Sequence, residues 1–198
     1  RVATICRSPS RRVAWLVCSK SNRMSILKPI TKRLYRVAVG SVRAANVRHY
    51  RGHGVHSPFV YSLVRQVFMR RRVEGEDTAL YTELISRHVS RRRATQLQNL
   101  YSHCGYENYL FADPYVEKLD GVEMCVIPRE CSADELHRLT DEAQRTQTTL
   151  CILAPRDEKA RNRQCRRLVS EHRGTSVDNR GYLLLFNVEG LPKQHFSL

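Results

Sequence analysis

The first 73 residues contain no aspartate or glutamate, although they hold 17 lysines and arginines. Residues 74–198 hold the other 17 basic residues and all 19 acidic ones, so the net charge of +15 comes from the N-terminal part. An acid-free basic segment attracts phosphate groups, whether these belong to RNA or to an anionic membrane surface. We therefore expect an anionic partner for this segment, with a role in solubility alone as the alternative.

Long apolar runs are also absent. The longest, Val13–Cys18 and Tyr182–Phe186, are far shorter than the roughly 20 residues that a membrane-spanning helix needs. The seven cysteines are odd in number and form no Cys-x-x-Cys pair, which is typical of reduced cytosolic proteins rather than of zinc sites or disulfide frameworks. These absences predict a cytoplasmic location.

Glycine-rich turns are missing as well, because the nine glycines are scattered along the chain. In a parallel α/β fold, a nucleotide or S-adenosylmethionine site needs such a turn after the first strand and an acid after the second. The segment Cys104–Glu107 supplies only one glycine. We therefore expect no bound cofactor, or S-adenosylmethionine if the protein is active.

The composition changes at the stretch from Arg51 to Tyr61, which divides the chain into three parts. Residues 1–23 show no periodicity, and we expect them to be disordered or to precede the natural start at Met24, and so to be dispensable for folding. Residues 24–50 predict a basic amphipathic helical arm. Residues 51–198 predict a single α/β domain.

Within this stretch, Ser57 and Pro58 form the cap and first-position pair that begins a helix, and Phe59 heads its apolar stripe. The spacing of His49, His53 and His56 would suit metal ligands on a helix. Because Gly52, Gly54 and Pro58 break that helix, we expect no metal site and a structural role for His56, hydrogen-bonded near the helix start.

After this helix the pattern predicts two further helices and then alternating strands and helices. Ser132 and Glu135 form a capping box, and residues 157–171 predict an exposed, arginine-rich helix. The order predicts a mostly parallel, partial Rossmann-like sheet with a C-terminal antiparallel hairpin, preceded by helices. The helices are expected at residues 58–70, 78–88, 93–102, 133–147 and 157–171, and the strands at 109–112, 122–127, 149–154, 175–177 and 182–188.

Two motifs resemble a family of S-adenosylmethionine-dependent, class I methyltransferase-like proteins found in Bacteroidetes. They read HGVHSPFVYSLV from His53 and GYLLLFNVEGLPKQHF from Gly181. In that family, the last part of the domain is strand, helix, strand, helix and an antiparallel hairpin, which matches the order expected from Val122 onward. The resemblance marks as motif residues His53, His56, Ser57, Pro58, Phe59, Lys193, Gln194 and His195.

The chain departs from this family in two ways. The segment that carries the family's first three strands is mostly missing between Tyr101 and Asp120, and its acidic pair after the fifth strand falls on Ala154–Asp157, which leaves one carboxylate. The resemblance therefore implies a degenerate methyltransferase-like protein that serves as a binding or scaffold protein.

Two alternatives remain open. One is an active methyltransferase with an altered cofactor site, for which the available carboxylates are Asp113, Asp120 and Asp157. The other is a basic RNA-binding protein that uses a set of arginines from the N-terminal part of the chain. These are Arg33, Arg36, Arg43, Arg48, Arg51, Arg70, Arg71 and Arg72.

Overall fold

A computed structural model describes residues 56–113, 116 and 118–198. The expected segments 1–23 and 24–50 lie outside the described residues, as do His53 and the arginines from Arg33 to Arg51. The helices are α3 (Pro58–Leu63), the π-helical turn η1 (Val64–Phe68), α4 (Ala79–Ser86), α5 (Arg91–His103), α6 (Ala133–Thr146) and α7 (Lys159–Glu171). The strands are β1 (Tyr109–Phe111), β2 (Met124–Ile127), β3 (Thr149–Leu153), β4 (Thr175–Asn179), β5 (Tyr182–Phe186) and β6 (Gln194–Ser197).

The strands form one six-stranded sheet in the order β1-β2-β3-β5-β4-β6. Strand β5 is antiparallel to both neighbours, whereas the other pairs are parallel. The expected mixed α/β fold with a mostly parallel sheet and a C-terminal hairpin is confirmed. The sequence analysis did not assign β6, which pairs with β4 and places His195 opposite Ser176.

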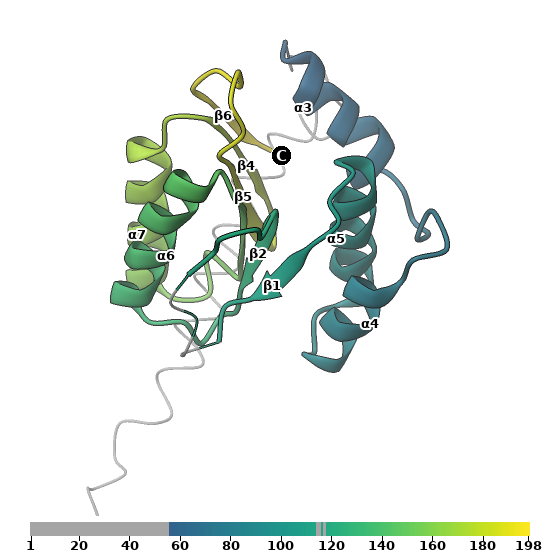
Figure 1. The fold of residues 1–198 in the computed structure, drawn as a ribbon, viewed down its shortest axis with the longest axis horizontal. Helices are drawn as coiled ribbons and strands as arrows, with labels where there is room; N and C mark the ends of the chain where they lie inside the picture. The colour runs from purple at the N-terminus through teal and green to yellow at the C-terminus, as the bar shows by residue number, and fades with distance from the viewer. Residues whose placement is uncertain (1–55, 114–115, 117) are drawn as a thin grey trace, which may run out of the picture.

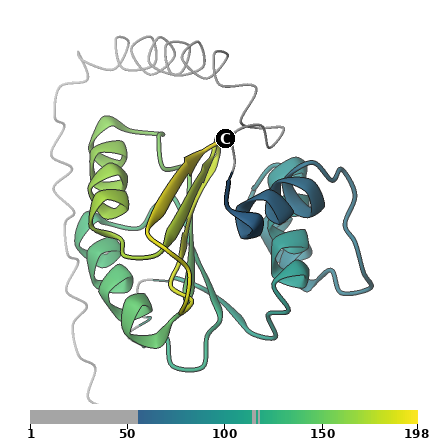
Figure 2. The same ribbon diagram turned by 90° about the horizontal axis from the view of Figure 1, so that it is seen from above.

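Helices cover both faces of the sheet, with α6 and α7 on one side and α3, α4 and α5 on the other (Figures 1 and 2). Successive strand residues point to opposite faces. Cys125 and Ile127 therefore join the core beneath α6 and α7, while Met124 and Val126 join the core beneath α3 to α5. This burial on both sides explains why the central strands read as continuous apolar runs.

The helix that begins at Pro58 docks on the sheet as expected. The Ser57 hydroxyl accepts a hydrogen bond from the Val60 N–H at 3.4 Å, and Pro58 occupies the first turn. Val60 and Leu63 are fully buried, as are Val64 and Val67 where the helix continues as η1. Phe59 is half-buried against the ring of Phe186 in β5.

Helix α5 holds the helical layer together through buried amide side chains. Gln96 donates to the Phe68 carbonyl at 2.8 Å, and Asn99 donates to the Arg72 carbonyl at 2.9 Å. Gln98 accepts from the Tyr81 N–H at 2.9 Å. The end of η1, the following loop and α4 are therefore anchored to one helix, and each buried amide is paired.

On the opposite face, the capping box of α6 forms as expected, with the Glu135 N–H donating to the Ser132 hydroxyl and Glu135 accepting from the Ser132 N–H. Helix α7 was expected to be exposed, and this was wrong for one of its faces. Arg161, Cys165 and Leu168 are buried on the same face of α7, at spacings of four and then three residues. In the described part of the chain, no helix is long and apolar enough to cross a membrane.

Candidate functional site

The carboxyl ends of β1, β2, β3 and β4 lie at one edge of the sheet because these strands run in the same direction. Open α/β sheets bind ligands outside this edge. Here the edge carries Asp113 after β1, Arg129 after β2, Asp157 after β3 and the turn at Gly181 that precedes β5. This carboxyl edge is therefore the candidate site.

Asp113 is already held by an arginine. Its carboxylate lies 3.3 Å from Nη1 of Arg87, which also forms an ion pair with Glu83 at 3.1 Å. The Arg87 guanidinium lies 4.1 Å from the centre of the Phe111 ring, an attractive cation–π arrangement. The residues that directly follow β1 are Ala112 and Asp113, so no glycine stands there.

Asp157 is also held by an arginine. It forms a close ion pair with Arg129, and its side chain is only 12% exposed. Arg129 additionally approaches Glu130 at 3.6 Å. The Arg129–Asp157 pair joins the loop after β2 to the loop after β3, so it spans the crevice between the carboxyl ends of these two strands.

Asp120 lies at the other edge of the sheet. It precedes β2 and forms a 3.0 Å ion pair with Arg145 near the end of α6, where both side chains are about three-fifths exposed. The three carboxylates that the sequence analysis named therefore do not converge. Two of them share the carboxyl edge, and the third is remote from it.

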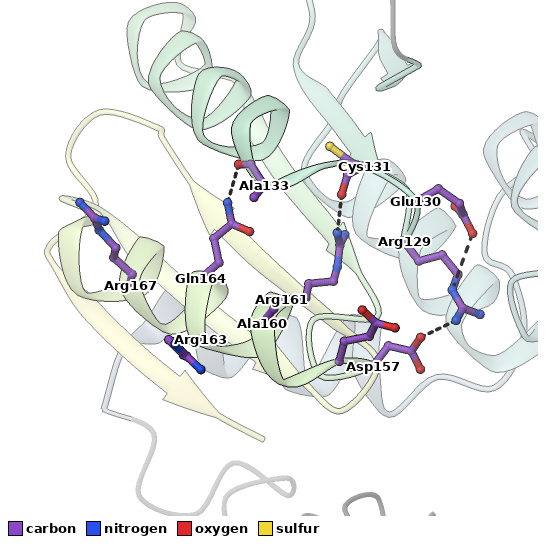
Figure 3. Close-up of a pocket in the computed structure, with 11 residues that line it drawn as sticks. Arg129, Glu130, Cys131, Ala133, Asp157, Ala160, Arg161, Arg163, Gln164 and Arg167 are labelled. Carbon is purple, nitrogen blue, oxygen red and sulfur yellow. Dashed lines mark hydrogen bonds and ion pairs between the residues drawn. The ribbon is translucent and has the colours of Figure 1, made fainter. Parts of the chain in front are cut away.

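A groove of about 880 Å³ opens between the N-terminal ends of α6 and α7 (Figure 3). We call it the α6–α7 groove; it is lined by residues from Arg129 to Ala133 and from Asp157 to Arg167. Arg161 in its wall donates to the carbonyls of Cys131 at 3.0 Å, Pro128 at 2.8 Å and Leu153 at 3.2 Å. This arginine therefore fixes the carboxyl ends of β2 and β3 to α7.

The groove also contains the half-buried thiol of Cys131. Desolvation, followed by the charge of Glu135, raises the pKa of this thiol above its usual range. Reactive cysteines are those with a lowered pKa. Cys131 is therefore protonated at neutral pH and is poorly suited to act as a nucleophile.

A smaller pocket of about 370 Å³ lies on the other side of the Arg129 loop, and we call it the carboxyl-edge pocket. Its walls come from the α4–α5 connection, the first turn of α5, the ends of β1, β2 and β3, and Gly181. The charged and polar lining residues are Arg87, His88, Ser90, Arg93, Arg129 and Glu130, and the apolar ones are Val89, Phe111, Pro128, Leu153 and Ala154. Arginine side chains thus outnumber carboxylates around an apolar floor.

The motif residues near the C-terminus secure β6. Lys193 donates to the Ser170 carbonyl at 2.9 Å, and the Gln194 carbonyl accepts from the Ser176 hydroxyl at 3.3 Å. His195 Nδ1 lies 3.0 Å from the same hydroxyl, and desolvation lowers the pKa of its imidazole. None of these three residues lines the carboxyl-edge pocket, whereas His195 lines a separate pocket of about 270 Å³.

At the start of α3, Ser57, Pro58 and Phe59 are likewise structural. His56 is exposed and makes no hydrogen bond to any residue that the structure describes, so the expected bond at the helix start is not seen there. Arg70, Arg71 and Arg72 form an exposed basic run after η1, with Arg70 paired to Glu74 at 3.0 Å.

Sequence reasoning missed Arg161, Arg93 and Gly181. Arg161 could have been found, because it stands four residues before Cys165 and seven before Leu168 on one helical stripe. The contact of Arg93 with Gly181 joins segments far apart in the sequence and left no local signal. Among the described residues, no group of three or more His, Cys, Asp and Glu side chains could hold a metal ion.

Comparison of the chain with protein-family models, curated proteins and solved structures found no match.

Proposed function

We propose that this protein is a degenerate, Rossmann-like methyltransferase-like domain that binds a partner or ligand without transferring a methyl group. The order β2, α6, β3, α7 and the β4–β5 hairpin supports this proposal, because the same order ends the domain in the family that the two motifs resemble. The short β1 and the absence of a glycine after it agree with a domain that has lost its cofactor-binding part.

One observation carries the proposal: Asp113 and Asp157, the two carboxylates that follow β1 and β3 at the carboxyl edge, are engaged by arginines. A cofactor ribose in such folds is held by a free carboxylate. Here Arg87 holds Asp113 and Arg129 holds Asp157, so a bound ribose would have to displace an ion pair. Methyl transfer depends mainly on holding the methyl donor in line with its acceptor, and such a site lacks the means to do so.

Isothermal titration calorimetry with S-adenosylmethionine tests this proposal. We expect no binding heat at micromolar protein concentrations. An Arg129→Gln variant, which lacks the Arg129–Asp157 ion pair, is the matched comparison: binding by this variant alone would mean that the ion pair blocks the site. Micromolar one-to-one binding by the parent chain would instead favour an active methyltransferase that uses Asp113 and Asp157.

The exposed run Arg70–Arg72 supports RNA binding as a second candidate function. Neither Arg71 nor Arg72 has an ion pair with a described residue, and both lie at the end of the acid-free part of the chain. We expect a single-stranded RNA to bind with strong salt dependence, and an Arg71→Ala/Arg72→Ala variant to lower the salt slope by about one per lost phosphate contact. Fluorescence anisotropy measures this, with Arg166→Ala on α7 as the control. Affinity that does not change with salt would exclude the candidate.

A further inference from the structure

We propose that the carboxyl-edge pocket binds a small phosphate monoester, with Arg93 as the principal ligand of the phosphate and the apolar floor as the seat of the attached group. This inference rests on the proposed function, since it names the ligand of a protein that we propose to bind a ligand without transferring a methyl group.

The size and lining of the pocket suit a small organic ligand. Its volume of about 370 Å³ lies within the range of known small-molecule sites, which are mostly apolar with a few convergent polar groups. Phe111, Leu153 and Val89 supply the apolar surface, and three arginines supply the polar one. A ligand with one apolar group and one anionic group matches both parts.

The charge of the lining favours an anion. Arg87, Arg93 and Arg129 face one carboxylate among the lining residues, that of Glu130. Arg87 and Arg129 are held in place by Asp113 and Asp157, whereas Arg93 has no ion pair with any residue that the structure describes. Arg93 is therefore the cation of this pocket that remains open to an external anion.

Gly181 positions Arg93. A Cβ atom built on Gly181 would lie 1.9 Å from Nε of Arg93 and 2.2 Å from its Cζ. The guanidinium thus packs directly on the backbone of Gly181. The side chain of any other residue at position 181 would occupy the same space. Fixing a guanidinium in advance lowers the conformational cost of binding, so this contact favours affinity.

One residue that lines the pocket, Ala154, has a positive φ that no helix end or hairpin turn accounts for. Four non-glycine residues of the described chain have a positive φ, and one of them, Gln147, caps the end of α6. His88 at 60° likewise ends α4, where the Val89 N–H donates to the Leu84 carbonyl at 2.9 Å, and Arg180 at 43° lies in the turn between β4 and β5. Ala154 at 48° follows β3 and lines the pocket. Non-glycine residues in this region cluster at ligand sites, where the surrounding structure maintains them.

The beginning of α5 adds donors that suit phosphate better than carboxylate. Ser90 precedes this 13-residue helix and lines the pocket, and its side chain makes no capping hydrogen bond. The first-turn N–H groups of α5 therefore have no side-chain acceptor at the cap. A phosphate has three oxygens, enough to accept from Arg93 and from such N–H groups together.

Calorimetric titration with phenyl phosphate tests the inference on the complete chain. We expect one-to-one binding by the parent, weaker binding of inorganic phosphate and none of phenol, since each lacks one half of the ligand. Arg93→Ala should weaken phenyl phosphate binding about tenfold or more, the loss expected for a charge-assisted contact. Arg91→Ala is the matched control, because Arg91 is exposed on the same turn but does not line the pocket, and its affinity should stay within about twofold.

Gly181→Ala provides a second, geometric test. The three atoms nearest to the added methyl group all belong to the Arg93 guanidinium, which can move toward solvent, so the variant should fold and retain its thermal transition. Its phenyl phosphate affinity should nevertheless fall as in Arg93→Ala. No binding of phenyl phosphate to the parent, or equal binding to the parent and Arg93→Ala, would overturn the inference. That result would leave the S-adenosylmethionine titration, and with it the proposed function, unaffected.

Discussion

The ring of Phe59 meets the ring of Phe186 edge to face, with centroids 5.0 Å apart and an interplanar angle of 88°. This contact joins the start of the first described helix to the strand inserted between β3 and β4. Edge-to-face pairs of this geometry contribute stability beyond the apolar area that they bury. Phe59 therefore has a packing role at the start of α3.

Replacing Phe59 by alanine should destabilise the fold by about 3 kcal/mol, near the lower end of the range for phenylalanine because the ring is only half-buried. Ser57→Ala should cost about 1 kcal/mol through loss of the helix cap. His56→Ala is the control and should change little, since His56 is exposed. Urea denaturation of the three variants measures these differences. A Phe59→Ala protein as stable as the parent would contradict the docking of this helix.

Local sequence patterns were sufficient for most elements. The Ser132–Glu135 capping box predicted the start of α6, and the continuous apolar runs predicted β2, β3 and β5. Strand β6 could not be predicted in this way, because it is four residues long, largely exposed and defined by pairing with β4. Its position is a property of tertiary structure rather than of local propensity.

The candidate site was only partly predictable for a similar reason. The sequence placed Asp113 and Asp157 after strands that run in parallel, so their common edge follows from topology. Their ion pairs with Arg87 and Arg129 do not follow from topology, because each arginine comes from another segment of the chain. Long-range partners of this kind decide whether a carboxylate at such an edge is available to a cofactor. The sequence alone therefore could not decide whether Asp113 and Asp157 hold a cofactor.

Arg161 should be among the most sensitive positions of the domain. It is 9% exposed and donates to three backbone carbonyls at the ends of β2 and β3, while its Nε has no partner in the described structure. Arg161→Ala leaves these buried carbonyls unpaired and opens a cavity, and we expect a loss of about 3 kcal/mol or more. Arg163→Ala, an exposed change on the same helix, should be nearly neutral.

Arg161→Lys extends this test. Lysine presents a single ammonium group and cannot reproduce the planar geometry with which the guanidinium reaches three carbonyls. We expect this variant to recover less than half of the lost stability, as measured by chemical denaturation. Full recovery by lysine would mean that the planar geometry of the guanidinium is not required at this position.

The thiols of the described residues should react with alkylating reagents in a defined order. Cys125, Cys151 and Cys165 are buried, and desolvation raises the pKa of Cys125 to about 12 and that of Cys165 to about 11. Cys104 and Cys131 are half-buried. Desolvation also raises the pKa of Cys104, to about 11, so brief iodoacetamide treatment at pH 8 should modify Cys131 first, followed by Cys104. Peptide mass spectrometry measures this order, and early modification of Cys125 or Cys151 would contradict it.

His172 should make the fold less stable in mild acid. Its side chain is 2% exposed, and its Nε2 lies 3.1 Å from the Phe186 carbonyl, to which a neutral ring can donate. Desolvation, together with the charge of Lys193, lowers the pKa of this imidazole below the unfolded value of 6.5. The unfolded chain therefore binds a proton at a higher pH than the folded chain does, and this binding favours unfolding.

The difference between the folded and unfolded pKa values of His172 sets the pH range over which stability is lost. The contribution of His172 is fully present above pH 6.5 and is lost as the pH falls from 6.5 toward the lowered pKa of the folded state, at no more than about 1.4 kcal/mol per pH unit. His172→Gln, which keeps a donor but does not titrate, should show a flatter profile over pH 7.5 to 5 in urea denaturation. The pKa of His195 is also lowered, so some slope should remain in the variant. Parallel profiles for the parent and His172→Gln would show that the imidazole is not held neutral in the folded protein.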